Sequence, residues 1–494
     1  MSVFVGRWRP VPSRPLLSTK NMGFGGHLER GWVAVPGDGN APAAGRVVIV
    51  GASLAGLRAA EALREEGFAG SLTLVGQERQ EPYDRPPLSK RVLQGLMPPE
   101  HTELPKRRVV DADWRLGVSA TGLDLSDRRV HLADGQDLGF DRLLIATGVR
   151  ARPWPNSAQA GLEGVCTLRT SDDARRLVER LDAGPGRVLV IGAGFTGSEI
   201  ASVCRERGLQ VTVAERGPAP LIGALGGVIG ATAADMQRDH GVDLRCGVTV
   251  TALEGDGQQR LCRAQFSDGQ TLEVDLAVVA LGAVRNTEWL AGSGLAAGPR
   301  GVASDAGCRA FDLNGIVTDD VFVVGDVARC PHPLYEYQLL ALEHWSNAIA
   351  QAEVAAHNMM NPGPRRRPHL AIPAFWSSQF GVNIKSVGVP TFADEVAIVQ
   401  GSVQERRFVA VYGYRGRVTA AVAFDQGMWL DFYCQLIETA VPFPPEFRTV
   451  GGPEKIQVLP ADVPDPAVLS HGPSVTVTGY LPDERRVTFA PSTA

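Results

Sequence analysis

The residues from Arg46 to Glu78 constrain the fold of this chain more than any other stretch. An apolar, β-branched run at 47–50 has the composition of a buried strand, and a glycine turn and a helical segment with small residues follow it. A second apolar run at 72–75 completes a βαβ unit. Because the first turn of such a unit points a helix N-terminus at a phosphate group, the pattern predicts a dinucleotide-binding unit.

The glycine turn of this first unit departs from the pattern G-x-G-x-x-G at one position. Gly51 permits the turn and Gly56 lets helix and strand pack closely, but Ser53 stands where the second glycine is expected. A serine there still donates its backbone N–H and adds only a small side chain. Glu78, just past the second strand, is placed to accept a hydrogen bond from a ribose hydroxyl. Taken alone, the stretch also fits an ordinary α/β core unit.

A second unit, from Val188 to Arg216, favours nucleotide binding because the chain repeats the pattern. Here the fingerprint is complete, with Gly192, Gly194 and Gly197 before a helix. Glu215 ends the second strand, the position that binds a ribose 2′-OH and repels a 2′-phosphate. This favours NADH over NADPH, although Arg216 weakens the preference. The run VVALGA, which contains Gly282, closes the unit.

Two further apolar runs end in residues suited to a ligand. LLIATG at 143–148 ends in Thr147 and Gly148, and VFVVGDVA at 321–328 contains Gly325 and Asp326. Ligands of parallel sheets bind at the carboxyl ends of the strands. Asp326 can accept hydrogen bonds from a polyol there. Three prolines, at 82, 86 and 87, lie between the first βαβ unit and LLIATG. They predict a rigid extended loop that holds Arg85 and Lys90.

The order of these segments predicts an α/β protein with two Rossmann-like dinucleotide-binding domains and a C-terminal α+β domain. Alternating strand patterns at 369–445 indicate the third domain. The predicted division is a disordered N-terminal extension (1–45), a discontinuous FAD-binding domain (46–160 and 285–365), an NAD-binding domain (161–284), a C-terminal reductase domain (366–460) and a tail of little expected order (461–494).

Composition excludes several classes of function. The 494 residues are 44% hydrophobic and 21% charged, as in a soluble globular protein, and no apolar run reaches the roughly 20 residues that span a bilayer. The net charge of −5 gives no bias toward nucleic acid. The first 45 residues are basic and rich in proline and glycine but lack the apolar core of a secretory signal. A cytoplasmic protein that neither enters a membrane nor binds nucleic acid is expected.

The seven cysteines are scattered, without a C-x-x-C pair or metal-ligand spacing, so no metal site is predicted. Disulfide reductases use a C-x-x-C or C-x-x-x-x-C pair. This chain has neither pair, which argues against disulfide reductase chemistry. The hydrolase motifs G-x-S-x-G and H-E-x-x-H are also absent. Two basic runs, 106–108 and 365–367, fit either solvated loop charge or a docking surface for an acidic partner.

Three motifs taken together carry a resemblance to a known family. They are PYDRPPLSK at 82–90, LEHWSNA at 342–348 and AFWSSQFG at 374–381. With the two glycine units in this order, they resemble the FAD-dependent ferredoxin-NAD reductases, the group that includes putidaredoxin, rubredoxin and dioxygenase ferredoxin reductases. The resemblance covers roughly 46–443. Arg285 is a departure, because the family usually has proline before Asn286.

The resemblance implies roles for individual residues. Lys90 would lie near flavin N5, and Glu199 would stand beside the nicotinamide, which makes these two the candidate catalytic residues. FAD would be held by Gly51, Ser53, Leu54, Ala55, Gly56, Glu78, Arg85, Lys90, Thr147, Gly148, Gly325, Asp326, His344, Trp345 and Trp376. NADH would be held by Gly192, Gly194, Phe195, Thr196, Gly197, Glu199, Glu215 and Gly282.

The function implied is electron transfer from NADH through FAD to an iron–sulfur ferredoxin that feeds an oxygenase, by a monomer or homodimer. Hydride transfer to the flavin followed by release of single electrons would join a two-electron donor to a one-electron acceptor. Two alternatives stay open. One is an NADH-dependent quinone or nitrite reductase or an oxidase, and the other is an NADH-sensing flavoprotein similar to apoptosis-inducing factor.

Overall fold

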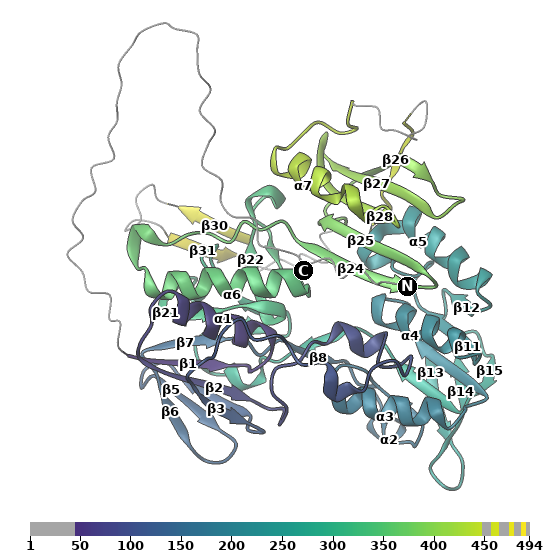
Figure 1. Cartoon of the computed structure of the whole chain (residues 1–494), viewed down its shortest axis with the longest axis horizontal. Helices are drawn as coiled ribbons and strands as arrows, with labels where there is room; N and C mark the ends of the chain where they lie inside the picture. Colours follow the sequence, from purple (N-terminus) through teal and green to yellow (C-terminus); the bar gives the residue numbers. More distant parts are fainter. Residues whose placement is uncertain (1–44, 447–455, 464–473, 479–485, 491–494) are drawn as a thin grey trace, which may run out of the picture. The chain divides into compact units, whose positions relative to one another are not determined.

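The computed structural model describes residues 45–446, 456–463, 474–478 and 486–490. The predicted N-terminal extension, up to residue 44, lies outside these residues. Within the described part, three larger β-sheets each pack against helices (Figure 1). The first two sheets are mainly parallel and the third is antiparallel, which is the predicted fold class.

The first sheet contains the first βαβ unit. Its strands, in spatial order, are β20 (Arg309–Phe311), β21 (Val317–Val323), β7 (Arg142–Ile145), β1 (Arg46–Val50), β2 (Ser71–Gly76) and β3 (Asp113–Leu116). β1 runs parallel to both β2 and β7, and β21 runs parallel to β7. A segment beyond residue 300 therefore returns to complete the sheet that begins the chain, as a discontinuous domain requires.

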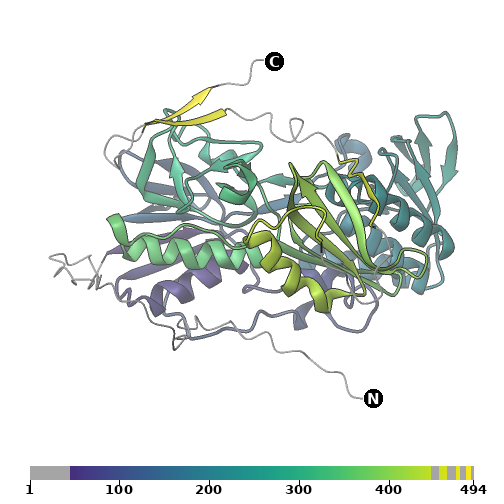
Figure 2. The same ribbon diagram turned by 90° about the horizontal axis from the view of Figure 1, so that it is seen from above.

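Two helices cover one face of the first sheet. α1 (Leu54–Glu65) and α6 (Trp345–Met360) lie side by side (Figure 2). Their contact is built from small residues, since Ala59 in α1 and Ala355 in α6 are fully buried in one apolar cluster. Small side chains let the helix backbones approach closely. The N-termini of both helices lie at the same end of the sheet, where Leu54 and Trp345 line one cavity.

The second sheet repeats the arrangement with the complete glycine fingerprint. Its strands, in spatial order, are β12 (Asp243–Cys246), β11 (Gln210–Glu215), β10 (Arg187–Ile191), β16 (Leu276–Val279) and β9 (Val165–Cys166). Its helices are α3 (Ser171–Asp182), α4 (Phe195–Glu206) and α5 (Ile222–Asp239). Thr170 caps α3 in a capping box with Asp173. α5 is interrupted at Gly226, whose φ is 74°.

The third sheet is antiparallel from β24 to β29. Its strands, in spatial order, are β24 (Ala374–Gln379), β25 (Val382–Gly388), β28 (Arg417–Phe424), β27 (Arg407–Tyr414), β26 (Glu395–Ser402) and β29 (Val458–Pro460). α7 (Leu430–Glu438) packs on one face, and α5 of the second sheet packs on the other through Leu225 and Tyr412. The third sheet is thus attached to the second by a shared core.

Smaller sheets connect or flank these three. They are β4 (Ala120–Asp124), β5 (Arg129–Leu132) and β6 (Asp137–Gly139); β8 (Val149–Ala151) and β17 (Ala283–Arg285); β13 (Val250–Gly255), β14 (Leu261–Phe266) and β15 (Thr271–Glu273); β18 (Ala297–Gly298), β19 (Gly301–Ala303), β22 (Ala328–Pro331) and β23 (Leu339–Leu340); and β30 (Ser474–Thr478) with β31 (Arg486–Ala490). A one-turn helix, α2 (Ser157–Ala160), precedes β9.

Two local expectations differ from the structure. The proline loop is not extended throughout, because Pro86–Ser89 forms a 3₁₀ turn, η1, that begins with two prolines. The fixed φ of proline suits the first positions of a helical turn. In the tail, β30 and β31 pair as antiparallel strands where little order was expected. The predicted boundaries between domains stay predictions.

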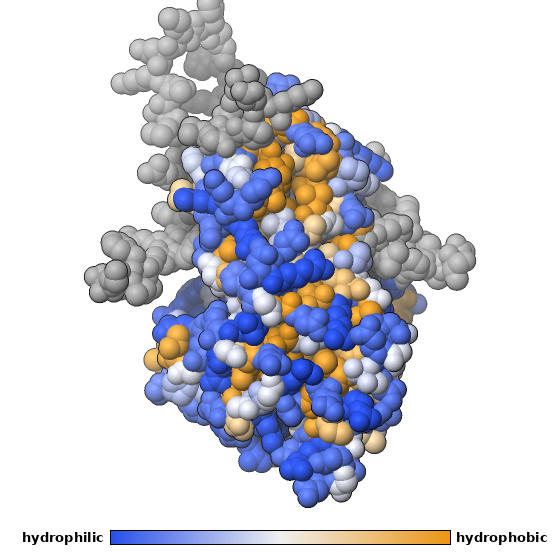
Figure 3. All heavy atoms as spheres, turned by 90° about the vertical axis from the view of Figure 1, so that its right-hand side faces the viewer, coloured by the Kyte–Doolittle hydropathy of each residue, from blue (hydrophilic) through white to orange (hydrophobic). Residues whose placement is uncertain are grey.

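The surface is mixed. On the face drawn in Figure 3, hydrophobic areas are broken up by charged and polar residues. Such a pattern is ordinary, because apolar atoms contribute more than half of most protein surfaces. Among the described residues, no helix combines the length and the apolar character that crossing a membrane requires.

We expect the Tyr412→Phe variant to lose about 1–2 kcal/mol of stability. The buried Tyr412 hydroxyl donates a 2.6 Å hydrogen bond to the Leu225 carbonyl just before the break in α5, and phenylalanine leaves that carbonyl without its donor. Urea unfolding of the purified variants measures the change. Tyr337→Phe, at a side chain that is 68% exposed, is the control and should unfold as the native chain does.

Candidate functional site

The turn after β1 brings two backbone segments closer than any side chain allows. Gly51 has a φ of 122°, and a Cβ on it would lie 2.1 Å from the Ala146 carbonyl oxygen. A Cβ on Gly56 would lie 1.9 Å from the Gly51 carbonyl oxygen. Ser53 is the N-cap residue of α1, but its side chain makes no capping hydrogen bond. The helix therefore begins at a tight turn with its first amides available to a ligand.

The second glycine turn has the same geometry. A Cβ on Gly192 would lie 2.4 Å from the Ala280 carbonyl oxygen, and one on Gly197 would lie 2.0 Å from the Gly192 carbonyl oxygen. Gly194 is the N-cap residue of α4, and as a glycine it has no side chain to occupy the first amides of the helix. Glu215 accepts hydrogen bonds of 2.7 Å from the backbone amides of Ala193 and Gly217. Its carboxylate thus stands at the glycine turn.

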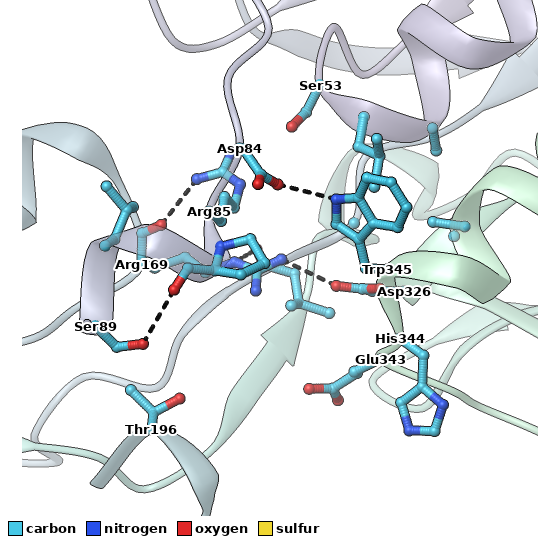
Figure 4. Close-up of a pocket in the computed structure, with 18 of the residues that line it drawn as sticks. Ser53, Asp84, Arg85, Ser89, Arg169, Thr196, Asp326, Glu343, His344 and Trp345 are labelled. Atoms are coloured by element: carbon cyan, nitrogen blue, oxygen red, sulfur yellow. Dashed lines mark hydrogen bonds and ion pairs between the residues drawn. The ribbon is translucent and has the colours of Figure 1, made fainter. Parts of the chain in front are cut away.

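A single cavity of about 460 Å³ joins the two turns. Figure 4 shows side chains from several elements around it, with Ser53 at one side and Thr196 at the other. Fifteen of the predicted residues line it, namely Ser53, Leu54, Ala55, Arg85, Lys90, Thr147, Gly148, Phe195, Thr196, Glu199, Gly325, Asp326, His344, Trp345 and Trp376. One space is therefore bounded by the N-terminal turns of α1, α4 and α6.

The other predicted residues do not line this cavity. They are Gly51, Gly56, Glu78, Gly192, Gly194, Gly197, Glu215 and Gly282. Most are glycines that lie within the turns. Glu78 is bonded instead to the proline loop, where it accepts hydrogen bonds from the Tyr83 hydroxyl and, at 2.5 Å, from Arg85. A ribose hydroxyl would have to share this carboxylate with the two side chains.

The two candidate catalytic residues are paired. Lys90 Nζ lies 2.8 Å from Glu199 Oε2, and the Glu199 side chain is 6% exposed. Lys90 follows η1 in the proline loop, whereas Glu199 belongs to α4 of the second sheet. The ion pair therefore crosses from the first nucleotide unit to the second inside the cavity. A buried carboxylate is stable in this position because a cation neutralises it.

A second ion pair holds Asp326. Arg169 Nη2 lies 2.9 Å from Asp326 Oδ2, and the Arg169 carbonyl accepts a 2.9 Å hydrogen bond from Arg85 (Figure 4). The sequence had no signal for Arg169, which stands in a loop before α3. Five other residues of the cavity wall were also not singled out from the sequence, namely Tyr83, Asp84, Ser89, Glu343 and Phe375. These five lie inside the three quoted motifs, so the motifs themselves were the signal.

Aromatic side chains form another part of the wall. Trp345 and Trp376 meet edge to face with ring centroids 6.0 Å apart. Trp345 Nε1 donates a 2.9 Å hydrogen bond to Asp84, whose pKa is raised by burial although this hydrogen bond opposes the shift (Figure 4). Trp376 is 42% exposed. The aromatic pair therefore extends from the cavity to the molecular surface.

Arg285, the departure from the family pattern, takes part in this site. Its guanidinium lies 3.1 Å from Glu343, whose pKa is raised by burial and by Asp326 while Arg285 opposes the shift. Asn286 donates a 2.8 Å hydrogen bond to the Thr147 carbonyl, and the Thr147 hydroxyl donates one of 2.8 Å to the Asn286 carbonyl. The loop with the unusual arginine thus still fixes Thr147.

The residues present fit FAD. The close backbone approaches at Gly51 and Gly56 leave backbone amides at the start of α1, and the cavity is lined by the Asp326 carboxylate and by two tryptophans. His344 Nδ1 is buried and has no hydrogen-bond partner among the described residues, as expected for an atom that faces a ligand. No cysteine lines the cavity, and all seven cysteines are free. Among the described residues, no cluster of side chains could hold a metal ion.

Comparison with known proteins identifies the family. Residues 45–352 match the pyridine nucleotide-disulphide oxidoreductases, and residues 374–448 match the reductase C-terminal domain. The chain belongs to the ferredoxin reductases of this oxidoreductase family. The family and the enzyme class predicted from the sequence, an FAD-dependent NAD(P)H oxidoreductase, are confirmed.

Individual relatives support this assignment. The chain is 36% identical to a probable ferredoxin reductase, CtmF, of Castellaniella defragrans, over 77% of this chain and 90% of that protein. It is 33% identical to the ferredoxin–NAD(+) reductase component of a biphenyl dioxygenase system from Paraburkholderia xenovorans, over 80% and 93%. The covalent putidaredoxin reductase–putidaredoxin complex matches with a TM-score of 0.74 and 30% identity, over 81% and 94%.

His344 makes stability depend on pH. Burial lowers its pKa from 6.5 to about 4, so the folded chain keeps it neutral where the unfolded chain takes up a proton. Its contribution is complete above about pH 6.5 and is lost as the pH falls toward 4, by up to roughly 3 kcal/mol. We expect His344→Gln to reduce the loss of stability between pH 7 and 5, measured by urea unfolding. If the exposed His101→Gln control gave the same reduction, burial of His344 would not be the cause.

Proposed function

We propose that this protein transfers electrons from NADH, through FAD, to an iron–sulfur ferredoxin that serves an oxygenase. The observation that carries the proposal is the single cavity lined by both nucleotide units and spanned by the Lys90–Glu199 ion pair. One space bordered by both nucleotide units is what direct transfer between two bound nucleotides requires. The names of the relatives, which include ferredoxin–NAD(+) reductase components, support the acceptor.

FAD would be held by the α1 turn, by Arg85 and Arg169, by Thr147 and Gly148, and by Asp326. When bound, it supplies acceptance of hydride and release of single electrons. NADH would enter along the α4 turn beside Phe195 and Thr196. Glu215 would bind its adenosine ribose, which favours NADH over NADPH because a carboxylate repels a 2′-phosphate.

The chain's own residues orient the two nucleotides and control charge between them. Lys90 brings a positive charge to the cavity, which would favour an electron-rich ring beside it, and Glu199 balances that charge at 2.8 Å. The aromatic side chains Phe195, Phe375 and Trp345 exclude water from the walls. Water exclusion strengthens each of these interactions.

No cysteine pair at the cavity could accept the electrons, so we expect them to leave the flavin for an acceptor outside this chain. The pair Trp345 and Trp376 connects the cavity to the surface, and the exposed Trp376 stands opposite Lys385 of β25. Lys385 packs against Gly427, next to the exposed Met428 and Trp429. We propose that the ferredoxin docks on this aromatic surface, formed by Trp376, Lys385, Met428 and Trp429.

The two basic runs support docking less strongly. Lys106 and Arg107 pair with Glu81 and Glu353, at 2.6 and 2.7 Å. Arg366 and Arg367 pair with Asp319 and Glu66, at 3.0 and 3.3 Å. These acids of the same chain compensate most of the charge that would attract an acidic ferredoxin, so the aromatic surface is the better candidate.

The purified holoprotein tests the function directly. Under anaerobic conditions, NADH should bleach the flavin absorbance, and a 2Fe–2S ferredoxin should then be reduced rapidly and with preference for NADH over NADPH. Bleaching without fast ferredoxin reduction would favour a quinone or nitrite reductase or an NADH sensor. A chain that neither carries nor takes up FAD would contradict the assignment of the first βαβ unit.

Trp429→Ala should raise the KM for ferredoxin by about 10-fold, since tryptophan is enriched among the few interface residues whose truncation costs more than about 1 kcal/mol. Reduction of ferricyanide by NADH should stay at the native rate, because a small acceptor needs no docking surface. Leu313→Ala, at a side chain that is 70% exposed on the turn between β20 and β21, is the control. An unchanged KM in Trp429→Ala would place the docking surface elsewhere.

A further inference from the structure

Helix α4 and strand β24 meet along matching stripes. Phe195, Glu199 and Ser202 lie on one face of α4, because they are spaced four and three residues apart. Alternate residues of β24, beginning with Phe375 and Ser377, face them. The Phe195 and Phe375 rings lie 4.6 Å apart, and the Ser202 hydroxyl accepts a 2.7 Å hydrogen bond from the backbone amide that follows β24, at Phe380. The third sheet therefore reaches into the nucleotide cavity.

The middle contact of this stripe involves the carboxylate of Glu199. Its Oε2 atom lies 2.8 Å from Lys90 Nζ and accepts a 2.5 Å hydrogen bond from the Ser89 hydroxyl. Its Oε1 atom accepts a 2.6 Å hydrogen bond from the Ser377 hydroxyl. Ser377 is 1% exposed, so this donor is shielded from bulk water. Ser377 therefore fixes the carboxylate about its last torsion together with Lys90 and Ser89, and it does so from the side of Oε1.

Ser377 is itself oriented by a neighbour on the same strand. Gln379 donates a 3.1 Å hydrogen bond to the Ser377 oxygen, and both side chains are buried. Since the oxygen accepts from Gln379, the hydroxyl proton is free to point at Glu199. The donors thus form a chain from Gln379 through Ser377 to Glu199. Ser378, the next residue, points away and donates to Asn383 on the exposed side.

We propose that Ser377 is a positioning residue for hydride transfer, which it serves by holding the Glu199 carboxylate against Lys90 and toward the nicotinamide. This inference rests on the proposed function. Loss of hydride from NADH leaves a positive charge on the nicotinamide, and a correctly oriented carboxylate stabilises that charge. NADH itself has a neutral ring, so its binding depends less on the orientation. Ser377 should therefore affect the rate of transfer and the affinity for NAD⁺ more than the affinity for NADH.

A pair of isosteric variants isolates the hydroxyl. Ser377→Thr keeps the hydroxyl donor. Ser377→Val has the same side-chain shape as Ser377→Thr but lacks the hydroxyl. We expect Ser377→Val to slow flavin bleaching at saturating NADH by about 10- to 100-fold, the loss that follows removal of a hydrogen bond to a charged group. Ser377→Thr should stay within about 3-fold of the native chain, with a similar NADH concentration at half-saturation in all variants. Ser378→Ala is the matched control on the exposed side.

A measurement without turnover separates positioning from packing. Calorimetric titration of NAD⁺ into the oxidised holoprotein should show affinity weakened about 10-fold in Ser377→Val and retained in Ser377→Thr. Equal rates and equal NAD⁺ affinities in the valine and threonine variants would overturn the proposal, because both fill the same space. If both larger side chains prevent folding, Ser377→Ala against Ser378→Ala makes the same comparison. A native chain whose flavin NADH does not bleach would instead contradict the proposed function.

Discussion

The buried carboxylate of Glu199 is the interaction on which the arrangement of the site depends. A carboxylate removed from water is stable only where cations and hydrogen-bond donors replace the water it has lost. Here the donors come from separate parts of the chain, with Lys90 and Ser89 on the proline loop and Ser377 on the third sheet. The proline loop and strand β24 must therefore both lie within hydrogen-bond distance of Glu199 on helix α4. In this arrangement the three segments form part of the cavity wall.

The two parallel sheets explain why a cavity forms at this point. In each sheet the central strands end in glycine turns, because a helix must begin immediately and close to the strand that precedes it. β21 returns beside β7, and so Asp326, which follows β21, joins the carboxyl ends of the strands of the first sheet. The antiparallel pair β8–β17 connects the first sheet to the second. Backbone amides, the Asp326 carboxylate and aromatic rings thus gather where two nucleotides would meet.

The chemistry of the cavity differs from what the name of the wider family suggests. Disulphide chemistry needs two thiols beside the redox cofactor, and no cysteine lines this cavity. An aromatic pair, Trp345 and Trp376, occupies the way out to the surface instead. In the proposed function this pair would face a protein partner that accepts one electron at a time, as the names of the ferredoxin reductases among the relatives suggest.

The amino-acid sequence by itself determined the two βαβ units, the third antiparallel sheet and most of the cavity wall. These follow from local rules, since the turns at Gly51 and Gly192 need only a missing side chain and a strand needs only its alternation. Tertiary structure decided which side chains meet. Arg169 finds Asp326 across 157 residues of chain, and Glu78 turns to Arg85 rather than to the cavity. Such contacts depend on how separate sheets are placed, which no local pattern encodes, and so they became visible only in three dimensions.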